Sequence, residues 1–351
     1  MNQQTLNRFQ QMIKLVRANE WWSYKLAPVL GTAYATAAIF NISLISLWST
    51  LLFLLVALVI GASYASVINN LCDREEDQIS GKANYFIGRS NIFIALSMIG
   101  CIVPGLIISG LLIQVPLALC VYIGNWILFT VYSLPPIRLK NRSFLGVLAI
   151  AVGESLVPQM LAIFLVTSNT DKPLSVIWLT TISIWAFASG LRSILWHQIL
   201  DFENDHLAGI NTFAVNTSKQ TLQRLGKWLV FPIEFVSLLA ILLLSDNFFN
   251  WIFLGLYLVT ELLRYYFWKL AIVIIEPTEN HRLFLIEYYD VFYPLGFLAL
   301  ASYKDSENLI IFGVHLLLYY PRLWWWIRDF WGLLRWEITN KLRNHNSYVK
   351  L

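Results

Sequence analysis

An asparagine and two aspartates, each four residues apart, follow an apolar run that extends from 51 to 68. In a helix, Asn69, Asp73 and Asp77 would share one face over about 12 Å, at the point where the apolar run reaches the membrane surface. Amide and carboxylate oxygens suit hard divalent cations such as Mg²⁺, whose shell is completed by water and substrate phosphates. The pattern therefore predicts a platform for a divalent cation.

The same spacing occurs a second time, 128 residues further along the chain. The residues His197, Gln198, Asp201, Asp205 and Gly209 repeat the positions of Asn69, Asn70, Asp73, Asp77 and Gly81. The second copy also closes an apolar run, 176–195. A solvated acidic helix end would explain one copy, but two copies in one register favour two halves that converge on a shared site, because acids at membrane depth are costly and usually functional.

The composition indicates that membrane helices carry these acidic faces. Of the 351 residues, 58% are hydrophobic and 13% are charged, and the mean hydropathy is +0.61, which is too apolar for an ordinary soluble domain. Apolar runs long enough to cross a bilayer lie at about 24–42, 49–70, 91–113, 116–134, 144–167, 174–198, 227–245, 250–272, 283–302 and 308–326. We therefore expect an all-α, polytopic transmembrane bundle.

Basic residues between these runs predict the orientation in the membrane. The only basic residues in the predicted outer loops are Lys172 and Lys304, whereas the other junctions and the C-terminal tail hold many lysines and arginines. The bias places both termini and both acidic faces in the cytoplasm, at the plasma membrane if the source is bacterial. Residues 1–22 are expected to form an amphipathic interfacial helix, 23–327 the bundle, and 328–351 a basic, aromatic tail that contacts membrane lipids. The net charge of +4 does not indicate a nucleic-acid partner, since the basic residues collect at segment ends.

Three motifs in this order resemble the UbiA superfamily of intramembrane prenyltransferases. The motif N-x-x-x-D-x-x-x-D stands here as Asn69, Asp73 and Asp77, and D-x-x-x-D followed by G-x-x-T stands as Asp201, Asp205, Gly209 and Thr212. The segment from Tyr132 to Lys140 resembles the family's Y-S-x-x-P-x-R-x-K turn. The resemblance covers about residues 15–245, and it implies a bundle of nine helices, where ten runs are counted, around a central cavity with a cytoplasmic-side active site.

The resemblance also implies roles for the motif residues. Asp73 and Asp77 would hold one Mg²⁺ and the second aspartate pair another, with Asn69 as a neutral ligand or a diphosphate contact. Cations at this place would stabilise the charge that develops on a departing pyrophosphate. The basic residues Lys82, Arg138 and Lys140 lie in the predicted cytoplasmic loops and are candidates for direct phosphate contact. For each of them, a solvated or headgroup-facing charge is the alternative.

Polar residues within the runs are further candidates for the substrate site. Glu154, near the middle of the fifth run, is expected to face the bundle interior, either as the base that takes a proton from the acceptor or as a protonated acid bonded to a neighbouring helix. Arg192 is interpreted as a counter-charge to the acidic faces. His197 shares a face with Asp201 and is a candidate for contact with diphosphate or metal, or else a hydrogen-bonded histidine at a helix end. Gln198 stands beside it as a further candidate.

The activity that these residues favour is Mg²⁺-dependent transfer of an isoprenyl group from a prenyl diphosphate to a hydrophobic or aromatic acceptor within the membrane. A terpene cyclase of the same superfamily is the first alternative, in which an internal double bond captures the carbocation. A membrane transporter is the second, because repeated halves also occur in carriers, although carriers bind their substrates near the midplane. The motifs specify neither the acceptor nor the length of the prenyl chain.

Overall fold

The apolar runs are helical, as expected where a membrane offers no partner for backbone N–H and C=O groups. A computed structural model describes residues 10–207, 209, 211–332 and 335. Its first half contains α2 (Ala18–Trp21), η1 (Trp22–Leu26), α3 (Ala27–Phe40), α4 (Trp48–Cys72), α5 (Arg74–Ser80), α6 (Asn91–Leu111), α7 (Pro116–Ser133), α8 (Phe144–Ile150), η5 (Ala151–Leu156) and α9 (Val157–Thr167). Its second half contains α10 (Val176–Leu200), α11 (Phe202–Leu207), α12 (Phe213–Asn216), α13 (Lys219–Leu225), η6 (Gly226–Val230), α14 (Phe231–Leu244), α15 (Phe248–Trp268), η7 (Tyr288–Phe292), α16 (Tyr293–Lys304) and α17 (Leu309–Leu318).

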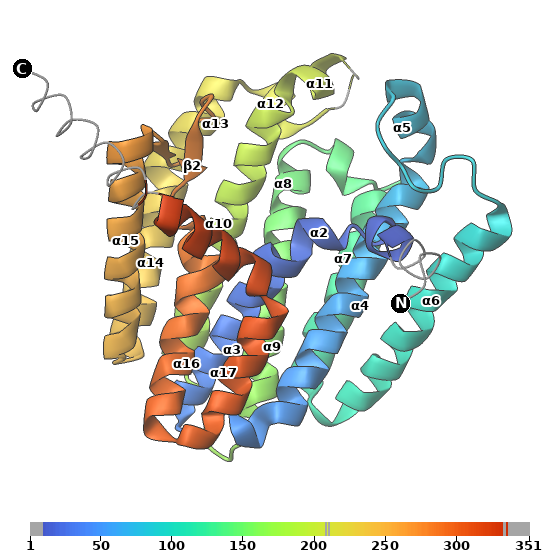
Figure 1. The fold of residues 1–351 in the computed structure, drawn as a ribbon. Helices are drawn as coiled ribbons and strands as arrows, with labels where there is room; N and C mark the ends of the chain where they lie inside the picture. Colours follow the sequence, from blue (N-terminus) through green and yellow to red (C-terminus); the bar gives the residue numbers. More distant parts are fainter. Residues whose placement is uncertain (1–9, 208, 210, 333–334, 336–351) are drawn as a thin grey trace, which may run out of the picture.

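The long helices stand side by side in one bundle, with α5 and α11 at the same end (Figure 1). Among the described residues, five helical stretches are long and apolar enough to cross a membrane: Ile45–Cys72, Asn91–Gln114, Pro116–Ser133, Phe144–Thr167 and Lys219–Leu244. The prediction of an all-α, polytopic membrane bundle is confirmed.

The last three predicted runs differ from the structure at their ends. The helix of the run 250–272 stops at Trp268, and Ala271–Val273 (β1) pairs in parallel with His281–Leu283 (β2), so the run 283–302 begins as a strand. The run 308–326 is interrupted: α17 ends at Leu318, and a separate helical segment covers 320–332. Pro321 explains this break, because it has no N–H to continue α17 but is tolerated in the first turn of the next helix.

The predicted interfacial helix at 1–22 lies partly outside the described residues. Its described part consists of a helical segment at 10–15, a turn, and α2. Arg17 adopts a left-handed backbone (φ 54°) at this turn, and the Trp21 indole donates a hydrogen bond to the Val16 carbonyl (2.8 Å). Two short helical segments therefore replace the single predicted helix. Most of the tail predicted at 328–351 also lies outside the described residues.

Small residues bring the central helices close together. Helix α3 is buried along nearly its whole length, and its glycine Gly31 packs directly against the ring of Tyr293 on α16. The turn η5 is enclosed in the same way, since a Cβ on Gly190 of α10 would lie 2.9 Å from the Ala151 carbonyl oxygen. Close approach of this kind lets packing and hydrogen bonds between helices replace the hydrophobic effect, which is weak inside a bilayer. It also restrains the backbone of η5.

Candidate active site

Backbone hydrogen bonds hold the first acidic motif in helical register across the junction of α4 and α5. The Asp73 N–H donates to the Asn69 carbonyl (2.9 Å), and the Asp77 N–H donates to the Asp73 carbonyl (2.8 Å). Gly81 then ends α5 with a left-handed backbone (φ 70°), which glycine adopts without steric cost. Asn69, Asp73 and Asp77 consequently follow one another at intervals of one helical turn.

The second motif has the same local structure at the end of α10. The Asp201 N–H donates to the His197 carbonyl (2.9 Å), and the Asp205 N–H donates to the Asp201 carbonyl (2.8 Å). Gly209 matches Gly81 with a φ of 67°. The sequence repeat is thus also a structural repeat, including the glycine that turns the chain after each acidic pair.

The loop after α7 supplies positive charge to the first motif. Both Arg138 (3.2 Å) and Lys140 contact the Asp73 carboxylate, and Arg138 also binds Glu76 through two hydrogen bonds of 2.7 Å. Two of the three predicted phosphate contacts are therefore beside the first aspartate pair. They occupy the place where a diphosphate held by that pair would need cationic partners.

The same loop connects the two motifs. The Ser143 N–H donates to the Asn211 carbonyl (3.2 Å), which places the loop alongside the chain that follows the second motif. Longer-range electrostatics agree with this arrangement, since the charge of Lys82 acts on Asp205, and the charges of Asp73 and Asp205 both act on Tyr132. The two acidic motifs therefore approach each other at one end of the bundle.

Asp205 is buried, and the charge of Asp201 acts on its carboxyl group. Its exposed fraction is 7%, and burial, followed by the charge of Asp201, raises the pKa of its carboxyl. The ammonium group of Lys82 and a hydrogen bond with the Thr212 hydroxyl offset part of this shift. A cation placed between Asp201 and Asp205 would relieve the repulsion between the two carboxylates.

The donor set of the two motifs fits Mg²⁺. Within the described residues, no group of three or more His, Cys, Asp or Glu side chains is arranged to enclose a metal ion. Each motif offers a pair of carboxylates. Carboxylate pairs are donors that Mg²⁺ accepts, since this ion keeps several waters and binds through one or two carboxylates plus substrate phosphates.

Two side chains outside the predicted set, Asn84 and Lys25, also belong to the candidate site. Asn84 donates hydrogen bonds to the Asp77 carboxylate (2.9 Å) and the Asn70 carbonyl (2.8 Å), which folds the chain after α5 back over the motif and positions the loop of Lys82. Lys25 of η1 forms an ion pair with Glu154 (2.9 Å). A basic residue inside an apolar run was the signal for Lys25, whereas nothing in the local pattern distinguishes Asn84.

The remaining predicted residues divide between the site and the framework. His197 interacts electrostatically with Asp201, Lys25 and Glu154 and so belongs with the site. Gln198 accepts a hydrogen bond from the Ala214 N–H (3.1 Å) and organises the loop after the second motif.

Arg192 does not act as the predicted counter-charge to the motif aspartates, because its guanidinium binds Glu234 of α14 (2.6 and 2.7 Å) and the Ile274 carbonyl (3.1 Å). The sequence shows that Arg192 needs an acidic partner, but not that α14 supplies it.

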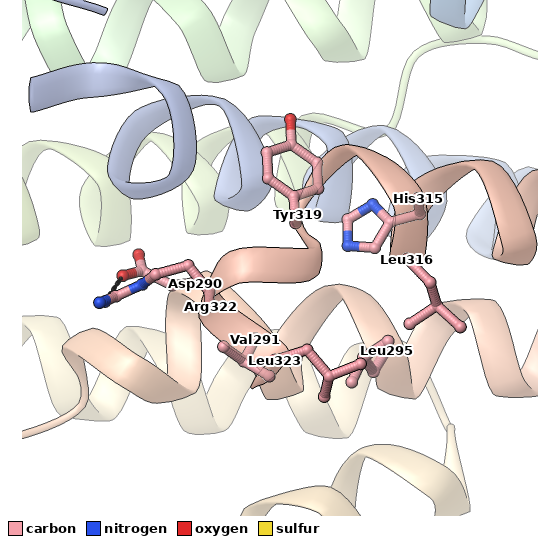
Figure 2. Close-up of a pocket in the computed structure, with 8 residues that line it drawn as sticks. All are labelled: Asp290, Val291, Leu295, His315, Leu316, Tyr319, Arg322 and Leu323. Carbon is pink, nitrogen blue, oxygen red and sulfur yellow. Dashed lines mark hydrogen bonds and ion pairs between the residues drawn. The ribbon is translucent and has the colours of Figure 1, made fainter. Parts of the chain in front are cut away.

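The C-terminal helical segment supports the turn that carries Lys25. Arg322 donates hydrogen bonds to the Tyr24 hydroxyl (3.2 Å) and the Asp290 carboxylate (2.5 Å), and the second of these is drawn in Figure 2. The Trp22 indole donates to the Leu318 carbonyl (3.0 Å) at the end of α17. The small pocket in Figure 2 lies between η7, α16, α17 and this segment, and none of the motif residues lines it.

Comparisons with known proteins agree with this fold and with the motifs. The model of the UbiA prenyltransferase family matches residues 26–286, which is most of the chain. The chain therefore belongs to the UbiA prenyltransferase family. The resemblance inferred from the motifs is confirmed, and the match extends beyond residue 245. The protein is accordingly an integral membrane protein of the prenyltransferase class.

Solved structures of a UbiA homolog from Archaeoglobus fulgidus share the fold. One has 16% sequence identity and a TM-score of 0.55, and the alignment covers 83% of this chain and 99% of that chain. Another, bound to GPP and Mg²⁺, has 15% identity and a TM-score of 0.50, with 91% and 99% covered. No curated protein sequence matched the chain.

Proposed function

We propose that this protein transfers an isoprenyl group from a prenyl diphosphate to a hydrophobic acceptor within the membrane, in a Mg²⁺-dependent reaction. Two acidic motifs with the same helical register carry the proposal, together with the hydrogen bond from Ser143 to Asn211 that brings the loop beside the first motif to the chain after the second. The electrostatic interaction of Lys82 with Asp205 agrees with this arrangement. The A. fulgidus homolog bound to GPP and Mg²⁺ supports the same choice of donor and metal. The bias of basic residues supports a cytoplasmic position for the motifs and for both termini.

In this proposal the four motif aspartates hold Mg²⁺, and Asn69 adds a neutral oxygen. When bound, Mg²⁺ would supply positive charge against the oxygens of the departing pyrophosphate. Arg138 and Lys140 would exchange part of their contact with Asp73 for the diphosphate oxygens, because charge-assisted hydrogen bonds from these donors suit carboxylate and phosphate alike. Lys82, which is exposed at the same end, would approach the diphosphate from the side of Asp205.

Substitution of one aspartate in each motif tests the proposal. In Asp73→Asn and in Asp201→Asn, Mg²⁺-dependent pyrophosphate release from geranyl diphosphate, measured with a total lipid extract as the source of acceptor, should fall by roughly 100-fold or more, because metal assistance contributes several kcal/mol to such a step. Glu307→Gln, in the exposed turn after α16, is the matched control and should retain the wild-type rate.

A variant that elutes as a folded monodisperse protein and still releases pyrophosphate at the wild-type rate would disprove the metal-binding role. Reactions with and without the lipid extract distinguish transfer, which needs an acceptor, from cyclisation, which does not. A labelled cyclic product formed from geranyl diphosphate alone, without extract, would assign the protein to the terpene cyclases instead.

A further inference from the structure

The ion pair between Lys25 and Glu154 is only partly buried, unlike the pair of Arg192 and Glu234. It joins two π-helical turns, η1 and η5, at a distance of 2.9 Å. Its side chains keep exposed fractions of 28% and 38%, whereas those of Arg192 and Glu234 are 1% and 0%. Both side chains of this pair thus keep some exposed surface, and π-helical turns occur frequently at functional sites.

Glu154 shares electrostatic neighbours with both acidic motifs. Each of the side chains Arg17, Tyr132 and His197 interacts electrostatically with Glu154 and with at least one motif aspartate, and together they reach both motifs. His197 precedes Asp201 by one turn of α10, which corresponds to about 6 Å along the helix axis. Glu154 therefore borders the site from the side of the bundle interior.

Close packing fixes the backbone that carries Glu154. A Cβ on Gly153 would lie 3.1 Å from the Phe129 ring of α7, and a Cβ on Gly190 of α10 would lie 2.8 Å from the side chain of Ser155. The turn η5 is therefore held between α7 and α10. The packing restrains the backbone of the turn, and the ion pair with Lys25 orients the carboxylate of Glu154 on it. A catalytic proton acceptor needs a position that is held in this way.

Prenyl transfer requires a proton acceptor in addition to the metal site. The bond between the prenyl carbon and the diphosphate oxygen breaks, its electron pair leaves with pyrophosphate, and a new bond forms between that carbon and the acceptor. The acceptor must then lose the proton of a hydroxyl group or of an aromatic carbon. The motif aspartates are committed to metal in the proposed function, and Asp73 is also engaged by Lys140.

We propose that the carboxylate of Glu154 takes this proton, and that Lys25 holds the carboxylate in place. This inference rests on the proposed function. It places the acceptor next to η1 and η5, on the interior side of the diphosphate, and it defines the acceptor class as a lipophilic molecule whose reacting hydroxyl or aromatic carbon carries a removable proton.

The test separates donor binding from product formation. Donor binding is measured as Mg²⁺-dependent binding of geranyl S-thiolodiphosphate, a non-ionising analogue, and product formation with labelled geranyl diphosphate and total lipid extract. In Glu154→Gln, analogue binding should stay within about threefold of wild type, whereas prenylated product should fall by roughly 10²–10⁴-fold. Labelled geraniol, formed when water captures the cation, should accumulate instead. Glu154→Asp should recover part of the product, and Lys25→Gln should reduce it less than Glu154→Gln does.

Two results would overturn the inference. Wild-type product formation in folded Glu154→Gln would exclude its role as the proton acceptor. Loss of analogue binding in Glu154→Gln, in parallel with loss of product, would assign Glu154 to donor binding. Failure of the proposed function itself gives a different result, because Asp73→Asn would then bind the analogue and release pyrophosphate as the wild type does. Glu307→Gln again serves as the control.

Discussion

Replacement of Arg192 by methionine should strongly destabilise the bundle. The guanidinium makes two hydrogen bonds of 2.6 and 2.7 Å to Glu234, and both side chains are almost completely buried. Removal of one partner of a buried ion pair costs about 3–5 kcal/mol, because the other charge stays buried without compensation. Among the described residues, the Tyr289 hydroxyl, 2.8 Å from Glu234, would then be the hydrogen-bond donor that remains for that carboxylate.

The double variant Arg192→Met/Glu234→Met supplies the matched control. It removes both charges and fills the space with apolar side chains. We therefore expect its free energy of unfolding to exceed that of Arg192→Met by about 2 kcal/mol or more. Thermal unfolding in detergent, followed by size-exclusion chromatography, should show a midpoint lower by roughly 5–15 °C for Arg192→Met. Folded Arg192→Met should still bind the thiolodiphosphate analogue. A midpoint within about 2 °C of wild type, or a double variant less stable than the single one, would refute the assignment of Arg192 to the framework.

Two further predictions concern the elements around Glu154. In Gly190→Ala the new methyl group would lie 2.9 Å from the Ala151 carbonyl oxygen, so α10 must move away from η5. We expect the free energy of unfolding to fall by about 1–3 kcal/mol and product formation to become slower. The control Gly255→Ala, whose Cβ meets nothing within 4 Å, should change neither quantity. In Arg322→Leu the turn of Lys25 loses its hydrogen bond from the C-terminal segment, and the buried Asp290 loses its ion-pair partner, so the variant should be less stable than wild type. In the protein that folds, product formation should fall by about 3–30-fold with analogue binding retained, and an equal loss of both would contradict this positioning role.

The local structure of the motifs could be predicted because it depends on helical spacing alone. Residues four apart share a helix face, and a glycine directly after a helix favours a left-handed end, so the repeated spacing specified the two matching structures that end at Gly81 and Gly209. Hydropathy likewise specified a membrane bundle. The interruption of the last run at Pro321 also had a local cause, because proline cannot continue a helix with a backbone N–H.

The neighbours of each helix face could not be predicted in the same way. An intramembrane charge needs a partner, but Arg192 had several acids as candidates, and the packing of α10 against α14 selected Glu234. Lys25 and Glu154 are separated by 129 positions in the chain and meet because η1 and η5 both border the same site.

The sequence by itself determined the membrane class, the family and the two acidic motifs, since these depend on hydrophobicity and on spacing within single helices. Only the tertiary structure decided which charges face the motifs and which serve the framework. The physical reason is that helix period fixes the face on which a side chain lies, whereas close packing at small residues such as Gly31 and Gly190 decides which helix that face meets.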